Sequence, residues 1–335
     1  MSYLQNYLAQ MVLLVALVLC SCQVMGQRVE LANGDVYEGD FVDGERNGHG
    51  VYLWSDGNRY EGAFSGDRMH GIGTYNWQDG RTYTGEFFSD QREGTGTLAW
   101  QNGDRYEGGF LNNRMHGQGE FRWANDDVFK GTFSQGRRTG KGIFTWHTGE
   151  KYKGDFEAGV LQGQGVYTWL DGRQFTGYFE NGAKTGQGIL QWPNGNRYVG
   201  SFAEDMRQGT GVFYWRDGTV YRGGFSANRM HGWGIKRQPD GAQEVQNWQT
   251  GELQHNQSMV AHDRCTLNHL QRQWMFLSDH CINGFAHGSG VAASLDGELI
   301  ISQGRFVLGE MVQGTLLRLP REDPSQQKTT AVEDN

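Results

Sequence analysis

The sequence predicts an all-β fold, an elongated antiparallel β-meander array of 23-residue, two-stranded units with a degenerate C-terminal extension. Two observations predict it. Eight tryptophans follow one another at a constant interval of 23 residues, and aromatic residues alternate with glycines between them. A constant period of this length is typical of a repeat array, in which each unit buries its apolar side only against its neighbours. The tryptophans are Trp54, Trp77, Trp100, Trp123, Trp146, Trp169, Trp192 and Trp215.

Each unit contains two stretches in which aromatic residues and glycines alternate. The first runs from Tyr37 to Phe41 (YEGDF) and returns from Tyr60 to Phe64 (YEGAF). The second begins with a Gly-x-Gly pair and ends at the tryptophan, as in residues 48–54. A period of two is that of a strand with one buried face, and it excludes a helix. The frame recurs about nine times without insertions, so we expect nine full units.

The connections between these stretches are also repeated. An Asp-Gly or Asn-Gly pair follows each of several tryptophans, as at residues 56–57, and supplies the positive φ angles of a tight hairpin turn. We expect the other connection, from Ser65 to His70, to be a longer loop. Two strands per unit in antiparallel order follow from this arrangement.

The glycines lie on the same face of the predicted strands as the rings. Glycine there leaves space for a neighbouring ring, so we expect the aromatic face to be the core. The opposite face is mostly polar. It is expected to change from acidic to basic along the array, because Glu38, Glu61 and Glu107 are replaced later by Lys130, Lys153 and Arg222. The predicted core consists of Tyr37, Phe41, Trp54, Tyr60, Phe64, Trp77, Trp100, Trp123, Trp146, Trp169, Trp192 and Trp215.

These repeats resemble the MORN (membrane occupation and recognition nexus) repeat, whose units look like Gly-x-x-Tyr-x-Gly-x-Phe-x-x-Gly-x-x-x-Gly-x-Gly-x-Tyr-x-Trp. The resemblance covers residue 34 to about residue 251. It implies an elongated, twisted antiparallel sheet used for protein or lipid contacts, often as an accessory to another domain. The phosphoinositide kinase and methyltransferase domains that accompany some members do not occur in this sequence.

The repeat frame decays after residue 234, and this divides the remaining chain. We expect the array to cover residues 27–251, ending in a partial unit that caps the exposed edge. Residues 252–283 are predicted to be a linker with one short helix around Leu267 to Leu277. Weaker glycine spacing makes residues 284–318 a degenerate, repeat-like β segment. The hydrophilic residues 319–335 are predicted to be a disordered tail.

The N-terminal residues 1–26 are expected to be an export signal. Met11 to Cys20 is an apolar run too short to span a bilayer. Two kinds of processing remain open: Cys22 lies where a bacterial lipobox would place a lipidated cysteine, whereas residues 24–26 before Gln27 suit an ordinary signal peptidase. In both cases we expect the protein in the cell envelope, in the periplasm or at the outer membrane if bacterial, and otherwise secreted.

Two further cysteines, Cys265 and Cys281, lie after the array. Export would allow them to form a disulfide. Free thiols remain an alternative, as does a metal site that includes His262, His269 and His280, although the CxxC spacing of a structural zinc site is missing.

Charge limits the partners. The net charge of −8 gives no support to nucleic-acid binding. A cation precedes the ring in every second unit, and two interpretations remain: a ligand edge for phosphate or carboxylate groups, or a duplicated two-unit block with solvated charges. These residues are Arg59, Arg105, Lys151 and Arg197.

No catalytic motif and no cofactor or metal motif occurs in the sequence. We therefore expect a non-enzymatic scaffold or binding protein of the cell envelope, which recognises a protein partner or associates with itself through the repeat sheet. The alternative is binding of membrane phospholipid or envelope polysaccharide by the array, with the aromatic residues as stacking platforms.

Overall fold

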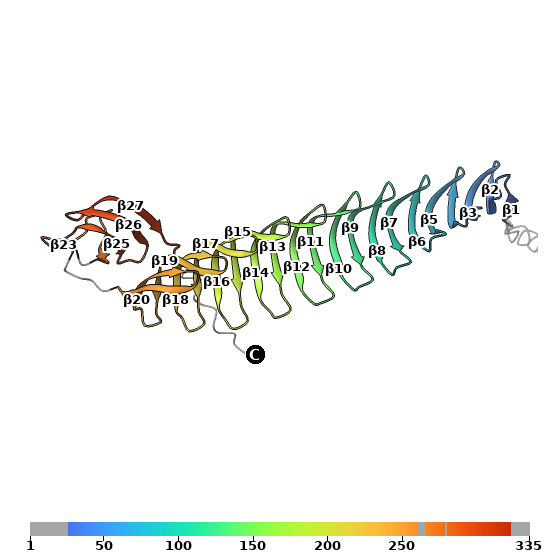
Figure 1. Ribbon diagram of the computed structural model, residues 1–335. Helices are drawn as coiled ribbons and strands as arrows, with labels where there is room; N and C mark the ends of the chain where they lie inside the picture. The colour runs from blue at the N-terminus through green and yellow to red at the C-terminus, as the bar shows by residue number, and fades with distance from the viewer. Residues whose placement is uncertain (1–25, 260–264, 279, 323–335) are drawn as a thin grey trace, which may run out of the picture. The chain divides into compact units, whose positions relative to one another are not determined.

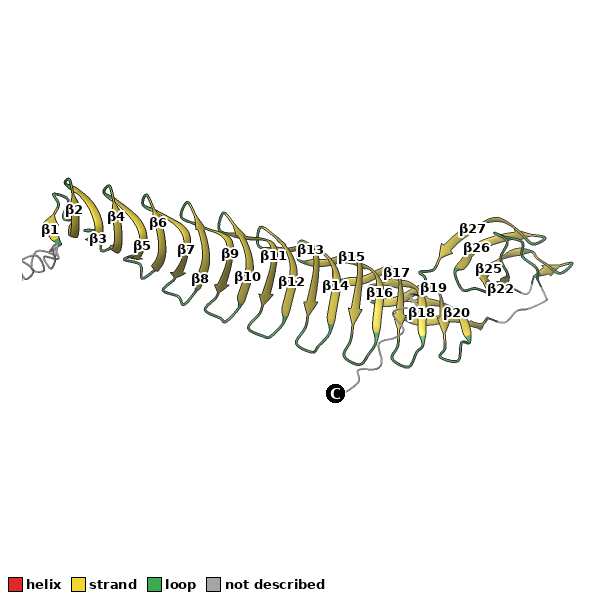
Figure 2. Ribbon diagram, turned by 180° about the vertical axis from the view of Figure 1, so that it is seen from behind, coloured by secondary structure: helices red, strands yellow, loops and turns green. Residues whose placement is uncertain are grey.

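The computed structural model describes residues 26–259, 265–278 and 280–322. By its internal contacts the chain divides into two compact units, Met1–Arg137 and Arg138–Asn335. Every regular element in the described part is a β-strand, which confirms the predicted all-β class (Figure 2). Among these residues, no helix is long and apolar enough to cross a membrane.

The first unit is an antiparallel meander (Figure 1). Each strand pairs with the strands before and after it in the sequence, as the two-stranded repeat predicts. The strands are β1 (Gln27–Glu30), β2 (Val36–Val42), β3 (Glu45–Leu53), β4 (Arg59–Ser65), β5 (Arg68–Asn76), β6 (Thr82–Phe88), β7 (Gln91–Ala99), β8 (Arg105–Leu111), β9 (Arg114–Arg122) and β10 (Val128–Ser134).

The second unit contains a meander of the same kind, again with sequential antiparallel pairing. Its strands are β11 (Arg137–Thr145), β12 (Lys151–Glu157), β13 (Val160–Thr168), β14 (Gln174–Glu180), β15 (Ala183–Gln191), β16 (Arg197–Ala203), β17 (Met206–Tyr214), β18 (Val220–Ser226), β19 (Arg229–Arg237), β20 (Gln243–Gln249) and β21 (Glu252–Ser258). The meander therefore includes residues 252–258, which we expected to begin a linker.

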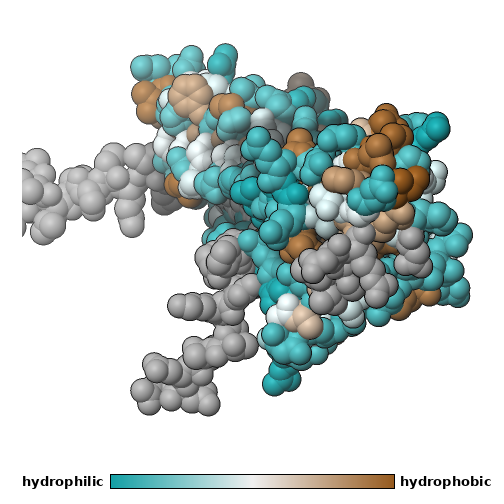
Figure 3. All heavy atoms as spheres, turned by 90° about the vertical axis from the view of Figure 1, so that its left-hand side faces the viewer, coloured by the Kyte–Doolittle hydropathy of each residue, from teal (hydrophilic) through white to brown (hydrophobic). Residues whose placement is uncertain are grey.

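The second unit also holds a small four-stranded sheet in the order β22-β25-β26-β27, and a separate two-stranded sheet of β23 and β24. Exposed apolar side chains, among them Val312 and Leu316, lie on the small sheet, and apolar surface is visible at this end of the second unit (Figure 3). The strands are β22 (Trp274–Phe276), β23 (Cys281–Ile282), β24 (Phe285–Ala286), β25 (Gly288–Ser294), β26 (Leu299–Val307) and β27 (Glu310–Arg318).

The helix predicted around Leu267 to Leu277 is wrong. Its last part is β22, where all three residues are buried. Trp274 and Phe276 point into one apolar cluster and Met275 into another, so the side chains follow the period of two of a strand buried on both faces. A strand that is buried on both faces has no polar face, so its sequence lacks the alternation that would have identified it as a strand.

The predicted lengths of the two kinds of turn are wrong: the turn predicted to be tight is the longer one, and the turn predicted to be long is the shorter one. The Asp-Gly pair lies in a five-residue connection from Trp54 to Asn58. The Trp54 N–H donates a 3.0 Å hydrogen bond to the Asn58 carbonyl, and the Gly57 N–H donates one of 3.0 Å to the Trp54 carbonyl. The connection expected to be long is a two-residue turn at Gly66 and Asp67, with φ angles of 55° and 65°. Positive φ at both positions suits a tight hairpin. A register shift after Gly62 accommodates the residues we had placed in the loop.

The buried side of the repeat, here called the aromatic face, is built from tyrosine rings lying over glycines. Tyr60 has no exposed surface, and its hydroxyl donates a 2.8 Å hydrogen bond to the carbonyl of Ala63. A Cβ atom on Gly73 would lie 2.4 Å from the Tyr60 ring, so only glycine fits there. Phe64 packs edge-on against Tyr60 at 5.1 Å between ring centroids. The same contacts return in both units.

The tryptophans are less buried than the sequence analysis assumed. Tyr37, Tyr60 and Phe64 are buried, whereas Phe41 and all eight repeat tryptophans are only half-buried. The reason is position: each tryptophan lies at the strand end where the five-residue turn begins, at the rim of the aromatic face. The side chains of the tyrosines and phenylalanines therefore form the interior, and the tryptophans line its edge.

Candidate functional site

The face opposite the aromatic rings, here called the open face, carries one central residue from each strand, and neighbouring residues pair across the strands. In the first unit this row is polar and largely acidic or threonine-rich. Its members, in strand order, are Glu38, Val51, Glu61, Thr74, Thr84, Thr97, Glu107, Glu120 and Lys130.

In the second unit the same row is mainly aliphatic. Burial increases along it, from the exposed Ile143 to the half-buried Ile189 and Val199 and the buried Val212. The row, in strand order, is Ile143, Lys153, Val166, Thr176, Ile189, Val199, Val212, Arg222, Ile235 and Val245. The predicted cations Lys130, Lys153 and Arg222 lie in this row after the acidic residues, but the prediction omitted the aliphatic residues that dominate the row in the second unit.

The last described segment of the chain covers one end of this aliphatic row. Leu319 is 2% exposed and packs in a cluster with Ile235 and Val245, to which the small sheet contributes Met275 and Ile300. Residues 319–322 have no regular secondary structure and follow directly after β27. The open face of the second unit therefore holds a non-helical peptide segment of its own chain.

An ion-pair cluster fixes the end of that segment. Arg237 donates hydrogen bonds of 2.7 Å and 3.2 Å to the carboxylate of Glu322, and the Nε of Arg222 lies 3.6 Å from the same group. The hydrogen bond to Glu322 raises the pKa of Arg237, whereas burial lowers the pKa of Arg222. Both arginines remain charged at neutral pH, since the guanidinium ordinarily titrates far above it. The open face thus recognises a carboxylate beside buried aliphatic groups.

A groove of about 220 Å³ lies next to this segment on the open face. Its base contains the aliphatic side chains of the central row, and two residues of the C-terminal segment line it as well. Arg321 is exposed at 75% of its side chain and pairs with Glu298 at 3.0 Å. The lining residues are Gln187, Ile189, Val199, Gly200, Thr210, Val212, Tyr214, Pro320 and Arg321.

The four predicted ligand-edge cations do not form one cluster. Arg59 pairs with Glu61 at 2.6 Å and Arg105 with Glu107 at 3.2 Å. Within each unit the two cations are separated by four strand spacings, roughly 19 Å, which is too far for one phosphate. Lys151 is exposed. Arg197 is 8% exposed and its guanidinium stacks on the ring of Tyr214 at 4.5 Å, so it alone lies beside the groove.

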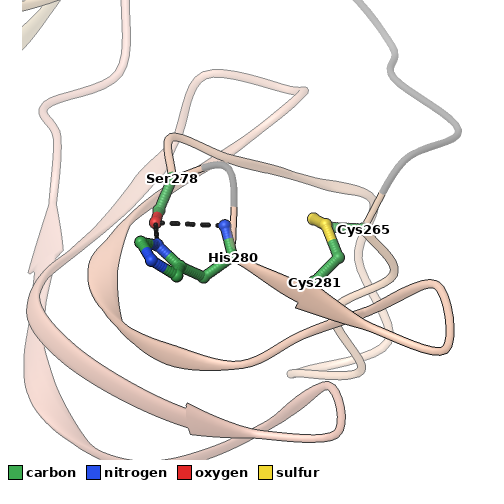
Figure 4. Close-up of a disulfide and its surroundings, with 4 residues drawn as sticks. All are labelled: Cys265, Ser278, His280 and Cys281. Atoms are coloured by element: carbon green, nitrogen blue, oxygen red, sulfur yellow. Dashed lines mark hydrogen bonds between the residues drawn. A yellow bond between two sulfur atoms is a disulfide. The ribbon is translucent and has the colours of Figure 1, made fainter.

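The cysteines after the array are joined. Cys265 and Cys281 form a disulfide with their Cα atoms 5.6 Å apart (Figure 4). His280 lies nearby, with its Nδ1 3.0 Å from the hydroxyl of Ser278, and His269 packs against Trp274. In the described part of the chain, no three His, Cys, Asp or Glu side chains are grouped as metal ligands.

Several predicted features lie outside the described residues. These are Cys22 with the rest of the export signal, His262, and residues 323–335 of the predicted tail. The part of that tail which the structure does describe, residues 319–322, packs on the open face. Neither the aliphatic row nor its cover was predicted from the sequence, although Val166, Ile189, Val212 and Ile235 recur at the repeat interval and could have indicated the row.

Comparisons with known proteins agree with the repeat architecture. The MORN repeat family model matches nine consecutive segments, at residues 37–59, 60–80, 83–105, 106–128, 129–151, 152–172, 175–197, 198–220 and 221–243. No curated protein matches the sequence of the chain.

Two solved structures show a distant similarity. One is the TCP10 domain of CPAP from Danio rerio in complex with a peptide of STIL, at 12% identity over 70% of this chain and 99% of that one, with a TM-score of 0.33. The other is the TCP10c domain of Sas-4 from Drosophila melanogaster, at 14% identity over 45% of this chain and 91% of that one, with a TM-score of 0.29. TM-scores this low support no inference about the present chain.

Proposed function

The chain belongs to the MORN repeat family, and from that premise we propose that it is a non-enzymatic scaffold whose open face binds an extended segment of a protein partner. The observation that carries the proposal is the C-terminal segment on the second unit. Leu319 is buried against the aliphatic row, and Glu322 binds Arg222 and Arg237. The same surface that holds this segment continues into an unfilled aliphatic groove.

The groove indicates the chemistry of the partner. Ile189, Val199 and Val212 favour aliphatic side chains, whose burial contributes about 25 cal/mol per Å² of apolar surface. Arg321 lines the groove with 75% of its side chain exposed, so a carboxylate at the groove edge can share this cation with Glu298. We propose an acidic segment with at least two aliphatic residues. The acidic row of the first unit gives no comparable support to binding of anionic phospholipid.

Selection from a library of 12-residue displayed peptides tests this function on the full chain. We expect enriched sequences to combine aliphatic residues with Asp or Glu. Val199→Asp should weaken binding of an enriched peptide at least tenfold, because it removes apolar contact and repels the carboxylate. Thr84→Asp, in the corresponding row of the first unit, is the matched control and should leave binding unchanged.

Three outcomes would overturn the proposal. One is the absence of enrichment, and the second is equal binding by wild type and Val199→Asp at unchanged melting temperature. The third is sedimentation of the protein with phosphatidylserine vesicles in the absence of any peptide binding, which would favour the lipid alternative.

We also propose that the protein is exported to the cell envelope. The apolar run from Met11 to Cys20 supports this, and so does the disulfide, because such bonds persist in oxidising compartments. The intact mass of the native protein tests it. A polypeptide that begins at Cys22 and carries the mass of a diacylglyceryl group would indicate a lipoprotein. A polypeptide that begins near Gln27 would indicate ordinary cleavage. An unprocessed polypeptide with free thiols would contradict export.

A further inference from the structure

Two arginines on the open face of the second unit take a carboxylate from outside the sheet. Arg222 lies directly opposite Ile235 across β18 and β19, and Arg237 follows Ile235 by two residues, on the same side of the strand. Ile235 carries no charge, and Glu322 of the C-terminal segment pairs with both arginines. The ion-pair site is therefore completed by a segment that is not part of the meander.

The first unit contains a similar pair of cations with the carboxylate built into the sheet. Glu120 lies opposite Lys130 and two residues before Arg122, and its carboxylate pairs with these cations at 2.8 Å and 2.9 Å. Ile235 has the same repeat position as Glu120, five intervals of 23 residues later. An isoleucine thus replaces the internal carboxylate in the second unit, which leaves its two arginines to accept a carboxylate from another segment.

Arg222 needs a carboxylate in any state of the protein. Only 8% of its side-chain surface is exposed, and loss of the partner of a buried charge is strongly destabilising. Exchange of one carboxylate for another keeps the buried cation paired. A carboxylate from a partner can therefore replace Glu322 at a lower cost in free energy than that of leaving the site empty.

The segment that carries Glu322 is anchored at its first residue. The N–H of Leu319 donates a 2.8 Å hydrogen bond to the carbonyl of Glu298, and the Leu319 side chain is buried. Pro320 has no N–H, so it cannot continue this backbone pairing. The ion pair of Arg321 with Glu298 is largely exposed and contributes little. Residues 320–322, here called the latch, can therefore move about Leu319 once their carboxylate is replaced.

The groove of the proposed function leads directly to this ion-pair site. Its base follows the central row, in which Val199 lies opposite both Ile189 and Val212. The next residue in the row is Arg222, directly opposite Val212. Two latch residues form one side of the groove. A segment bound along the aliphatic side chains therefore reaches the arginines at the next position of the row, where the latch carboxylate lies.

We propose that the latch is an internal competitor of the partner, and that an acidic residue of the partner displaces Glu322 from Arg222 and Arg237. This inference rests on the proposed function and adds its regulation. The partner first enters the groove, with Arg321 at its edge. Its carboxylate then takes the place of the Glu322 carboxylate, and the latch moves away and widens the groove. The latch is closed in the structure and open when the partner is bound.

Two substitutions break the same ion pair but leave different receptors. Glu322→Gln removes the competitor and keeps both arginines. It should tighten binding of a selected acidic 12-residue peptide about tenfold, the factor by which a latch closed in about 90% of molecules lowers the apparent affinity. Arg237→Gln also releases the latch but removes a receptor cation, so it should not tighten binding. Arg122→Gln, at the corresponding repeat position of the first unit, is the matched control and should leave affinity unchanged. Calorimetry on the full chain measures all three.

A second probe needs no selected partner. A synthetic peptide with the sequence of residues 316–322 supplies the latch as a separate molecule. It should bind the Glu322→Gln chain about tenfold more tightly than wild type, because the internal competitor is gone. The same peptide with glutamine in place of its glutamate should lose this gain. Both peptides have an amidated C-terminus, so that no terminal carboxylate can replace the side chain.

The outcomes separate this inference from the proposed function. Equal binding of selected peptides by wild type and Glu322→Gln would overturn the inference and leave the function intact. Equal tightening by Glu322→Gln and Arg237→Gln would also overturn it, because the arginines would then not receive the carboxylate. If selection yields no peptide but the 316–322 peptide prefers Glu322→Gln, the partner-binding function fails and the carboxylate exchange is supported.

A conservative variant covers the case in which Glu322→Gln does not fold. Glu322→Asp keeps a carboxylate on a shorter side chain, so it weakens the closed state without removing the charge. It should tighten binding of the same peptides about threefold. Unchanged affinity in this variant, at an unchanged circular dichroism spectrum, would overturn the inference.

Discussion

The two units share one repeat but differ on one face. On the aromatic face, Tyr60 in the first unit and Tyr152 in the second have no exposed surface and lie over glycine pairs in the same way. On the open face, the first unit carries Thr74 and Thr97 at the repeat positions where the second carries Ile189 and Val212. Thus the residues that define the repeat specify folding, and the residues between them are free to specify binding.

That difference has a physical origin in the single-layer sheet. One face must be buried for the array to be stable, and here rings over glycines achieve this within the layer itself. The other face needs no cover, so its side chains are under no packing constraint until another segment binds them. In the second unit the segment around Leu319 does so.

The largest effect should come from the face that the units share. Tyr60→Ala and Tyr152→Ala each remove a buried ring and leave a cavity above two glycines, so each should lower the free energy of unfolding by about 3 to 5 kcal/mol. Urea denaturation with amide exchange measures both. A loss in only one unit would show that the aromatic faces are not equivalent.

The next effect should appear only on the open face of the second unit. Glu322→Gln leaves Arg222 buried without its carboxylate, and should cost about 2 to 4 kcal/mol and loosen the segment around Leu319. Glu61→Gln removes the exposed partner of Arg59 and should cost less than about 1 kcal/mol. Thermal melts measure the melting temperature of each variant. Equal decreases in melting temperature would contradict a larger contribution of the Glu322 ion pairs on the covered face.

A smaller effect concerns the repeat tryptophans. Trp100→Ala and Trp192→Ala should each cost about 1 to 2 kcal/mol, because a half-buried indole loses only part of its transfer free energy. If the indoles were fully buried, each substitution would have the larger cost given above for the tyrosines. Denaturant midpoints measure the difference, and a loss as large as that of Tyr152→Ala would show that the tryptophans are core residues.

Much of the fold could be predicted because short sequence patterns within each repeat determine its strands. The period of two between Tyr37 and Trp54 identifies strands, and the glycines identify the face that the rings cover. The turn lengths were exchanged because an Asp-Gly pair indicates positive φ without showing how many residues surround it. The register shift after Gly62, which shortens the other turn, depends on pairing with the next strand.

The candidate site was missed because its aliphatic row lies on a face that was predicted to be polar, and because the segment that covers the row is distant in sequence. The acidic residues Glu38, Glu61 and Glu107 suggested the charge of the open face, while the aliphatic residues of the second unit lie on the same face. The contact of Glu322 with Arg222 and Arg237 joins residues far apart in sequence. No local sequence pattern could place residues 319–322 on the sheet. The hydrophilic residues that follow them in the sequence led to the prediction of a disordered tail.

The smallest expected effect is a pH response at the start of the first unit. Asp35 accepts hydrogen bonds from the Ser55 backbone N–H at 2.8 Å and the Tyr52 hydroxyl at 2.7 Å, which lower its pKa to about 2. A carboxyl whose folded pKa lies below its unfolded value of about 3.9 contributes stability above pH 4 and loses it as the pH falls toward 2. The hairpin of β2 and β3 should therefore open before the second unit as acid is added. Amide exchange at pH 4 and pH 2.5 measures this order, and Asp35→Asn should abolish the pH dependence. Equal protection of the two units in wild type at pH 2.5 would show that the first turn does not depend on this carboxylate.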